Sequence, residues 1–498
     1  MSTAPAGPDV NDARRWLVLA LVGVAQLTVV LDATIVNIAL PSAQTDLGFD
    51  DDNRQWVVTA YALAFGSLLL LGGRIGDLFG RKQAFVVGLV GFAAASALGG
   101  AAGSFGVLVA ARALQGVFGA LLAPAALAIL SVTFTDPAER GKAFGIYGAI
   151  AGVGAGIGLL LGGILTDALS WRWCLYVNLL FAIPVAVASV SIIRAHHRDR
   201  TAGGHRRGID LPGALTATVG LFALVFGVSN AETNGWGDTL TIVALVIAPI
   251  VLSAFVLVER RAAEPLLPLR VVLDPARGGS YFAIAVFGIV LFGVFLFLTY
   301  FLQQNLRYTP TEAGLAFMPM NLTIIVVSGL TAGVLLPRFG PRPLIIGGLV
   351  LAAIGAAWFA LRIDGDAGYA GAVLPGLLVI GVGGGFLFPT TFSTATLGVQ
   401  ERDTGVASAM LNTAQQVGGS IGIALLSTLF ASAVDGYAAD HPGPAVGAES
   451  VLHGYTTVFW WAAGLTFLGA VVAAVLVRTS REELASAPPV EGAGAGAH

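Results

Sequence analysis

Long runs of apolar residues, separated by short polar connections, follow one another along almost the whole chain. Each run is long enough, at about 20 residues, to cross the ~30 Å hydrocarbon core of a membrane as a helix. The runs are continuously apolar and do not alternate every second residue, as the strands of a membrane β-barrel do. The pattern therefore predicts fourteen transmembrane helices, with approximate bounds 16–40, 55–73, 83–103, 105–130, 143–166, 173–193, 211–229, 239–258, 279–302, 313–336, 343–361, 370–397, 405–432 and 454–477.

The composition agrees with a membrane protein. Hydrophobic residues make up 56% of the 498 residues and charged residues 11%, less than half of the ~25% usual in soluble domains. A net charge of −3 excludes a nucleic-acid-binding protein that depends on bulk positive charge. The single cysteine, Cys174, excludes a disulfide within the chain and a thiolate metal cluster. We expect neither a metal nor an organic cofactor.

Arginine and lysine residues lie mostly in alternate connections. If the N-terminus is cytoplasmic, 21 of the 26 fall on the cytoplasmic side and 4 on the outer side. Positive residues favour the cytoplasmic side of a membrane, and one missed or added crossing would invert the pattern after it. The sequence therefore predicts a multi-pass protein of the cytoplasmic (inner) membrane with both termini in the cytoplasm.

The chain contains an internal repeat. Segment 73–82, after the second predicted helix, recurs as 333–342 after the tenth, with its first and last glycines, its phenylalanine and its final basic residue at an offset of 260. Two parallel six-helix halves are an architecture of secondary transporters. We therefore predict an all-α membrane fold of two six-helix bundles, with helices 7 and 8 inserted as a pair beside the transport path. The expected divisions are 1–193 for the first bundle, 194–278 for the cytoplasmic linkers and inserted helices, 279–480 for the second bundle and 481–498 for a disordered tail.

Asp32 and Arg112 are the clearest ionisable residues inside the predicted helices. Counted at 1.5 Å per residue, both lie ~12–13 Å below the outer face, so they can pair or face one cavity. A charge at this depth costs on the order of 3 kcal/mol or more. A pair that only joins two helices is one interpretation, but burial makes such a pair a poor source of stability. We favour proton coupling with Asp32 as the proton carrier, because a guanidinium cannot usefully lose its proton.

Several motifs, in order along the chain, resemble one family. Segment 31–41 resembles the first-helix signature of the fourteen-helix drug:proton antiporters, a branch of the major facilitator superfamily. Segment 73–82 is similar to the loop signature of the superfamily, and 112–116 resembles its proton-linked helix-4 motif. The likeness covers about residues 14–480. It implies the major-facilitator fold and proton-coupled export (antiport) of drugs, antibiotics or dyes by alternating access.

Four residues of the loop signature are expected to form a cytoplasmic gate, namely Gly73, Asp77, Gly80 and Arg81. Glycines let helix ends approach closely, and Asp77 can pair with Arg81. In the family that the chain resembles, this loop latches the two halves together. A basic turn that only fixes topology is the alternative interpretation. Pro337 replaces the acid in the second copy, which we do not expect to latch in the same way.

The fifth predicted helix is rich in glycine, which permits close contact with a neighbouring helix. The family that the chain resembles carries its antiporter motif here, usually with prolines, and this resemblance implies that the motif seals helices against proton leak. Ala155 and Leu159 occupy the two expected proline positions, so the motif is incomplete. The glycines assigned to it are Gly152, Gly154, Gly156, Gly158, Gly162 and Gly163.

Other polar residues inside the predicted helices are candidates for a polar stripe in an apolar substrate cavity. A hydrogen bond between helices is the commoner role for any one of them. The candidates are Gln26, Asn37, Tyr61, Asn178, Asn321, Asn412, Gln415 and Gln416.

The sequence thus predicts a monomeric exporter and not an enzyme. Its expected partners are a small-molecule substrate, protons and the lipid bilayer, with no nucleic acid. The proton gradient is the expected energy source, because the chain contains no GxxxxGK[ST] phosphate-binding loop. An importer or facilitator of a small metabolite on the same fold is one alternative, and a non-transporting membrane sensor or membrane enzyme is another.

Overall fold

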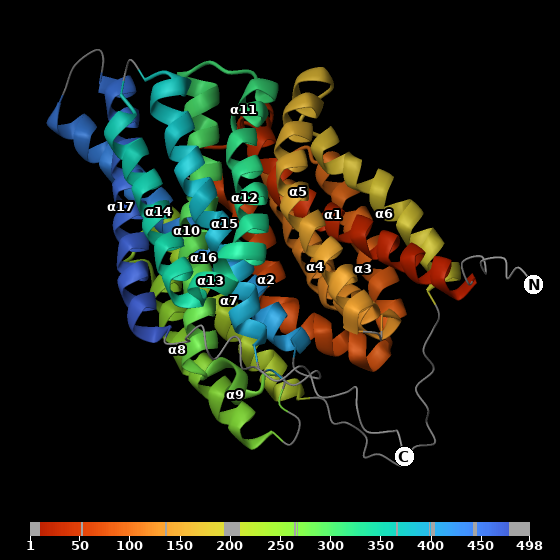
Figure 1. The fold of residues 1–498 in the computed structure, drawn as a ribbon. Helices are drawn as coiled ribbons and strands as arrows, with labels where there is room; N and C mark the ends of the chain where they lie inside the picture. The colour runs from red at the N-terminus through yellow and green to blue at the C-terminus, as the bar shows by residue number, and fades with distance from the viewer. Residues whose placement is uncertain are drawn as a thin grey trace, which may run out of the picture.

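The computed structural model describes residues 10–50, 53–134, 137–193, 210–262, 265, 267–364, 367–397, 399, 404–441 and 446–477. All regular secondary structure within these ranges is helical (Figure 1). Twelve helices there are long and apolar enough to cross a membrane, and they match twelve of the fourteen predicted crossings. The other two fall on α2 and α5, whose described apolar stretches, Gln55–Leu69 and Gly156–Ala168, are shorter. The count of fourteen crossings is therefore not confirmed.

The first half of the chain forms six helices. The predicted boundary between the third and fourth helices is confirmed, since α3 ends at Gly100 and α4 begins at Phe105. The prediction that the first helix ends near Pro41 is wrong, because α1 continues through this proline to Leu47. Membrane helices tolerate proline where neighbouring groups satisfy the freed carbonyl. The six helices are α1 (Val10–Leu47), α2 (Gln55–Phe79), α3 (Arg81–Gly100), α4 (Phe105–Thr133), α5 (Pro137–Ala168) and α6 (Trp173–Ile192).

The inserted pair consists of α7 (Leu211–Asn234) and α8 (Thr239–Arg261), followed by the short α9 (Leu269–Val272). Asp210 and Asp238 begin the two long helices, because their carboxylates accept hydrogen bonds from first-turn N–H groups. The helices of the second half are interrupted more often than the sequence predicts. Its elements are α10 (Pro275–Tyr300), η2 (Phe301–Asn305), α11 (Pro310–Ala316), α12 (Met318–Leu330), η3 (Thr331–Leu335), α13 (Leu336–Phe339), α14 (Pro341–Arg362), η4 (Tyr369–Val373), α15 (Leu374–Thr396), α16 (Thr404–Asp440) and α17 (Val446–Leu476).

The backbone repeats between the halves at the turns after α2 and α13. Gly80 and Gly340, which are 260 positions apart, both adopt positive φ, at 104° and 76°. Each donates its N–H to the carbonyl four residues earlier, at Gly76 and Leu336. This backbone conformation favours glycine, which explains why both copies of the segment keep glycine at this point.

The packing of helices also repeats. In the first half α1 packs on α5, and α3 packs on α4 and α6; in the second half α10 packs on α16, and α14 packs on α15 and α17. The two halves lie side by side, the first red to yellow and the second green to blue in Figure 1. The helix α7 packs on both α2 and α16, and α8 packs on α7. The inserted pair therefore lies beside the junction of the two halves.

Hydrogen bonds join the two halves at the end of the bundle that carries the α1–α2 connection, here called the closed end. Tyr300 donates its hydroxyl to Gln44 Oε1 at 2.6 Å, and Gln303 Nε2 donates to the carbonyl of Ile38 at 3.0 Å. The N–H of Thr311 donates to Asp167 at 2.9 Å. These bonds connect α1 and α5 of the first half to α10, η2 and α11 of the second.

Candidate functional site

Asp32 of α1 and Arg112 of α4 form an ion pair inside the first half. Arg112 Nη1 lies 2.6 Å from Asp32 Oδ2, and the two side chains are 1% and 0% exposed. Of the two arrangements expected for these residues, a pair or a shared cavity, the structure shows the pair. The contact is possible because α1 and α4 pack on each other.

Two amide side chains complete the coordination of the carboxylate. Gln115 Nε2 donates to Asp32 Oδ1 at 2.8 Å, and Asn178 Nδ2 of α6 donates to the same oxygen at 2.6 Å. The hydroxyl of Ser96, on α3, accepts from Gln115 at 2.7 Å. Asp32 therefore receives hydrogen bonds from donors on α4 and α6, as a buried ionised carboxylate requires.

The guanidinium of Arg112 has further partners on two elements. Its Nη1 also donates to Gln115 Oε1 at 2.9 Å, and its Nε donates to the carbonyl of Val57 at 3.0 Å. Its central carbon lies 4.5 Å from the ring centroid of Tyr61, within the range of a cation–π contact. We call Asp32, Arg112, Gln115, Asn178, Ser96 and Tyr61 the carboxylate cluster.

The carboxylate cluster differs from the sequence prediction in its membership. Tyr61 and Asn178, two of the candidates for a polar stripe, contact the ion pair. The bond from Asn178 to Asp32 joins α6 to α1, which is the commoner role expected of such residues. Gln115 and Ser96 were not predicted as site residues. Gln115 was detectable, because it follows Arg112 by three positions and so lies on the same face of α4. Ser96 gives no comparable signal, since only the packing of α3 on α4 brings it to the cluster.

The carboxylate cluster lies in one half only. Buried charged residues in the described part of the chain are Asp32, Arg54, Arg112, Asp210 and Glu259, all of which precede the second half. The two halves therefore share the packing of their helices, but the buried charged residues of the described chain do not recur in the second half. Chemically, the cluster holds one carboxylate whose negative charge is balanced by one guanidinium and can be neutralised by one proton.

The predicted gate residues contact α4 of the same half. A Cβ atom built on Gly73 would lie 3.4 Å from Pro124, and Arg81 Nη1 donates to the carbonyl of Ala128 at 3.4 Å. Gly80 forms the sharp turn between α2 and α3. The side chain of Asp77 lies outside the described residues. These contacts place the turn against α4 and leave the predicted latch between the halves untested.

Three glycines of the predicted α5 motif pack against α1. Gly154, Gly158 and Gly162 recur every four residues, which puts them on one face of the helix. A Cβ atom at Gly158 would lie 2.1 Å from Thr34 Oγ1, and each of the other two would meet an α1 side chain or carbonyl within 3.0 Å. Close contact with a neighbouring helix, as predicted for these glycines, is therefore confirmed.

Two other glycines of α5 face the second half. A Cβ atom at Gly163 would lie 2.4 Å from the carbonyl oxygen of Pro310, and one at Gly156 would lie 3.3 Å from the Cβ of Asn321. The contacts of Gly152 fall outside the described part of the structure. The glycines of α5 thus lie on two faces of the helix. One face packs against α1 of the first half, and the other packs against the second half.

The remaining substrate candidates on α1 and α12 bond mainly to nearby helix atoms. Tyr147 donates its hydroxyl to Gln26 Oε1 at 2.5 Å and so joins α5 to α1. Asn37 and Asn321 are buried and donate to backbone carbonyls of their own helices. The commoner role, a hydrogen bond within or between helices, is what these three side chains show.

The candidates on α16 differ in their solvent exposure. Asn412 is exposed and donates to the carbonyl of Ser408 at 3.4 Å. Gln415 and Gln416 are half-buried, and Gln416 packs within 3.5 Å of the Cβ position of Gly66 on α2. Gln416 therefore lies where the two halves meet.

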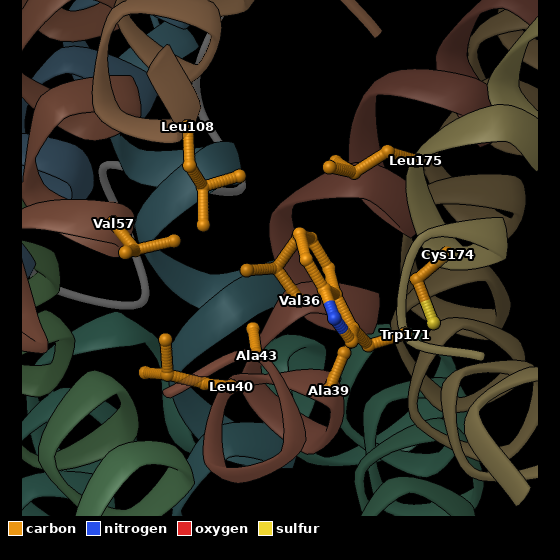
Figure 2. Close-up of a pocket in the computed structure, with 9 residues that line it drawn as sticks. All are labelled: Val36, Ala39, Leu40, Ala43, Val57, Leu108, Trp171, Cys174 and Leu175. Atoms are coloured by element: carbon orange, nitrogen blue, oxygen red, sulfur yellow. The ribbon is translucent and has the colours of Figure 1, made fainter. Parts of the chain in front are cut away.

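A small cavity lies among α1, α2, α4 and the start of α6 (Figure 2). Its volume of ≈10 Å³ is about the smallest that can hold one water molecule, so an organic substrate does not fit in it. The lining side chains are apolar apart from the indole nitrogen of Trp171 and the thiol of Cys174. The full lining consists of Val36, Ala39, Leu40, Ala43, Val57, Leu108, Trp171, Cys174 and Leu175.

Comparison of the sequence with known proteins identifies related transporters. A sequence model of the Major Facilitator Superfamily matches residues 22–423. The puromycin resistance protein pur8 of Streptomyces alboniger is 51% identical over 97% of this chain and 94% of that protein. The cephamycin export protein CmcT of Amycolatopsis lactamdurans is 40% identical over 85% and 86%. The lincomycin resistance protein of Streptomyces lincolnensis is 34% identical over 85% and 86%.

Solved structures share the fold. A bacterial homologue of the human lysosomal transporter Spinster, in an inward-facing and unoccupied conformation, aligns with a TM-score of 0.67 over 96% of this chain and 99% of that chain. A peptide transporter in complex with sulfate aligns with a TM-score of 0.67 over 92% and 94%. Both are 16% identical in sequence, so the likeness concerns the arrangement of helices alone.

Proposed function

Because the chain belongs to the Major Facilitator Superfamily, we propose that this transporter exports small organic compounds, antibiotics among them, in exchange for protons. Three relatives carry names of antibiotic resistance or export proteins, which supports a substrate of this kind. Puromycin is the first compound to test, since the relative named for it shares about half of all aligned residues.

The carboxylate cluster is the observation that carries the proton coupling. Protonation of Asp32 neutralises the carboxylate and removes its attraction for Arg112, which keeps its bonds to Gln115 and to the carbonyl of Val57. Protonation therefore loosens α1 from α4 while α4 keeps its own contacts. A proton on this one residue changes how α1 is held.

The link from the proton to the conformation runs along α1. The same helix that carries Asp32 holds Gln44 and Ile38, which bond to Tyr300 and Gln303 of the second half. A change in the attachment of α1 therefore acts on the contacts that keep the closed end shut. Rocking of two halves around a central site is the usual means of alternating access.

The finer topology belongs to the same proposal. We infer that α2 and α5 also cross the membrane, which gives fourteen crossings, places both termini in the cytoplasm and makes the closed end the outer end. The protein works as a monomer in this scheme, with the halves divided as the sequence predicts. The turn from Gly73 to Arg81 then lies on the cytoplasmic side, where it is suited to latch the halves when that side closes.

The proton gradient is an adequate energy source for such export. One proton moving inward supplies ~2.3 kcal/mol per 100 mV of membrane potential. At ~1.4 kcal/mol for each tenfold change, this energy supports a gradient of about 50-fold for a neutral substrate.

The test is transport by the purified protein in liposomes of known orientation. A pH gradient is imposed in each direction, and puromycin, cephamycin, lincomycin and a cationic dye are followed. The proposal predicts movement of at least one compound against the direction of proton flow, with proton release that depends on the compound. Movement in the same direction as protons would identify an importer and reject export, and movement with no response to the gradient would reject coupling.

A further inference from the structure

Arg54, at the start of α2, inserts its guanidinium among aromatic rings at the closed end. Its central carbon lies 4.2 Å from the ring centroid of Tyr300, 5.2 Å from that of Phe430 and 5.8 Å from that of Phe297. The arginine is only 3% exposed. A buried guanidinium over three rings is the arrangement in which a cation–π contact is strongest, because water is excluded.

The rings belong to the half of the molecule opposite to Arg54. Phe297 and Tyr300 lie on α10 and Phe430 on α16, and we call these three residues the aromatic box. The box is held by contacts among aromatic residues of the second half, with Phe297 and Phe430 at 5.5 Å and Phe430 and Tyr455 of α17 at 5.2 Å between centroids. Because α10, α16 and α17 pack on one another, Phe297 and Phe430 keep their places without the first half. Tyr300 lies on the same helix as Phe297, and its hydroxyl bonds to Gln44 of the first half.

Separation of the halves at the closed end therefore has a defined consequence. Arg54 moves away with the first half, while the aromatic box stays in the second half and loses its cation. A set of preformed ring faces that has just lost a guanidinium is complementary to another organic cation. We propose that the aromatic box is a binding site for the positively charged group of an organic cation, which Arg54 occupies while the closed end is shut.

This inference rests on the proposed alternating access and adds a site to it. A cationic compound that leaves through the open end meets the box at the point of exit. When the halves close again, Arg54 returns to the same rings and competes with the compound, so closure expels it to the outside. Neutral compounds of similar size gain nothing from the box and do not compete with the arginine.

The experiment measures binding to purified protein in lipid nanodiscs, with ethidium as a cationic probe and Nile red as a neutral one. Arg54→Gln removes the competing cation and keeps a shorter, uncharged polar side chain. We expect this variant to bind ethidium about tenfold more tightly than the unaltered protein, within the range of a cation–π contact to several desolvated rings. Binding of Nile red is expected to stay the same.

Two further variants make the result specific. Phe430→Leu, introduced together with Arg54→Gln, removes one wall of the box and is expected to abolish the gain. Arg172→Gln is the matched control, because Arg172 also stacks on a ring, Trp171, but within the first half; it is expected to leave ethidium binding unchanged.

Three results would overturn the inference: equal ethidium affinity with and without Arg54, a gain that survives Phe430→Leu, or an equal gain for Nile red. These outcomes are separate from a failure of the proposed function. If the unaltered protein transports no compound in liposomes, export is rejected, while the binding measurement still reports on the box.

Discussion

Replacement of Arg112 by methionine removes the positive charge of the buried ion pair while keeping a long apolar side chain. The change leaves three acceptors without this donor, namely Asp32 Oδ2, Gln115 Oε1 and the carbonyl of Val57. Because both charged side chains are about 0–1% exposed, water does not replace the lost partner. Removal of one member of such a pair costs about 3–5 kcal/mol of stability.

A second substitution tests whether the charge itself causes this cost. Asp32→Asn alone leaves the guanidinium buried without its counter-charge and is expected to cost a similar ~3–5 kcal/mol. When Asp32→Asn and Arg112→Met are combined, no charge remains, and the expected cost falls to the ~1–3 kcal/mol of unsatisfied hydrogen bonds. The double variant is therefore expected to be more stable than either single variant.

The assay is the free energy of unfolding in mixed micelles, measured for the unaltered protein, both single variants and the double variant. The four values form a double-mutant cycle, and the structure predicts a coupling energy of about 3 kcal/mol or more. Costs that simply add in the double variant would show that the two side chains do not interact, and would refute the ion pair as the organising contact of the carboxylate cluster.

Three further outcomes are expected. Gly158→Ala places a Cβ atom 2.1 Å from Thr34 Oγ1, so it should lower the melting temperature, whereas Gly103→Ala, with nothing within 4 Å of the added atom, should not; equal melting temperatures would contradict the α1–α5 packing. Asn178→Leu removes a donor to the buried carboxylate, so it should lower the free energy of unfolding by about 1–3 kcal/mol; an unchanged stability would remove this amide from the carboxylate cluster. A cysteine at position 247, on the exposed surface of α8 and in a Cys174→Ala background, should react with a maleimide equally with and without substrate; protection by substrate would place α8 in the transport path.

Much of the fold follows from the sequence because the lipid environment imposes one simple rule. A membrane helix must be apolar for about 20 residues, and this rule located twelve crossings that the structure confirms. Pro41 shows the limit of the rule: proline usually ends a helix in water, but α1 continues beyond it. In the tenth predicted helix, the break at Phe317 precedes Pro319 in the first turn of α12, and a proline has no N–H to continue the preceding helix. The π-helix η3 interrupts the same predicted helix without interrupting its apolar pattern.

The site was predictable only where charge was involved. Asp32 and Arg112 stand out because a charge is costly at membrane depth, and the sequence left a pair and a shared cavity as the two possible arrangements. Neutral polar residues such as Asn37 and Asn178 are indistinguishable in sequence, yet one bonds to its own helix and the other to the buried carboxylate. Their roles depend on which face of the helix meets a neighbour, which only the packing determines.

The central claim is that Asp32 couples transport to the proton gradient. Its most direct test is pH-gradient-driven export by Asp32→Asn in liposomes, compared with the unaltered protein and with Asp46→Asn. The control makes the same substitution on the same helix, but at a carboxylate that is half-exposed and bonds to Arg172 and Trp171. We predict that Asp32→Asn inserts and still binds substrate but shows no export in response to the gradient, while Asp46→Asn exports normally. Full gradient-driven export by Asp32→Asn would contradict the account.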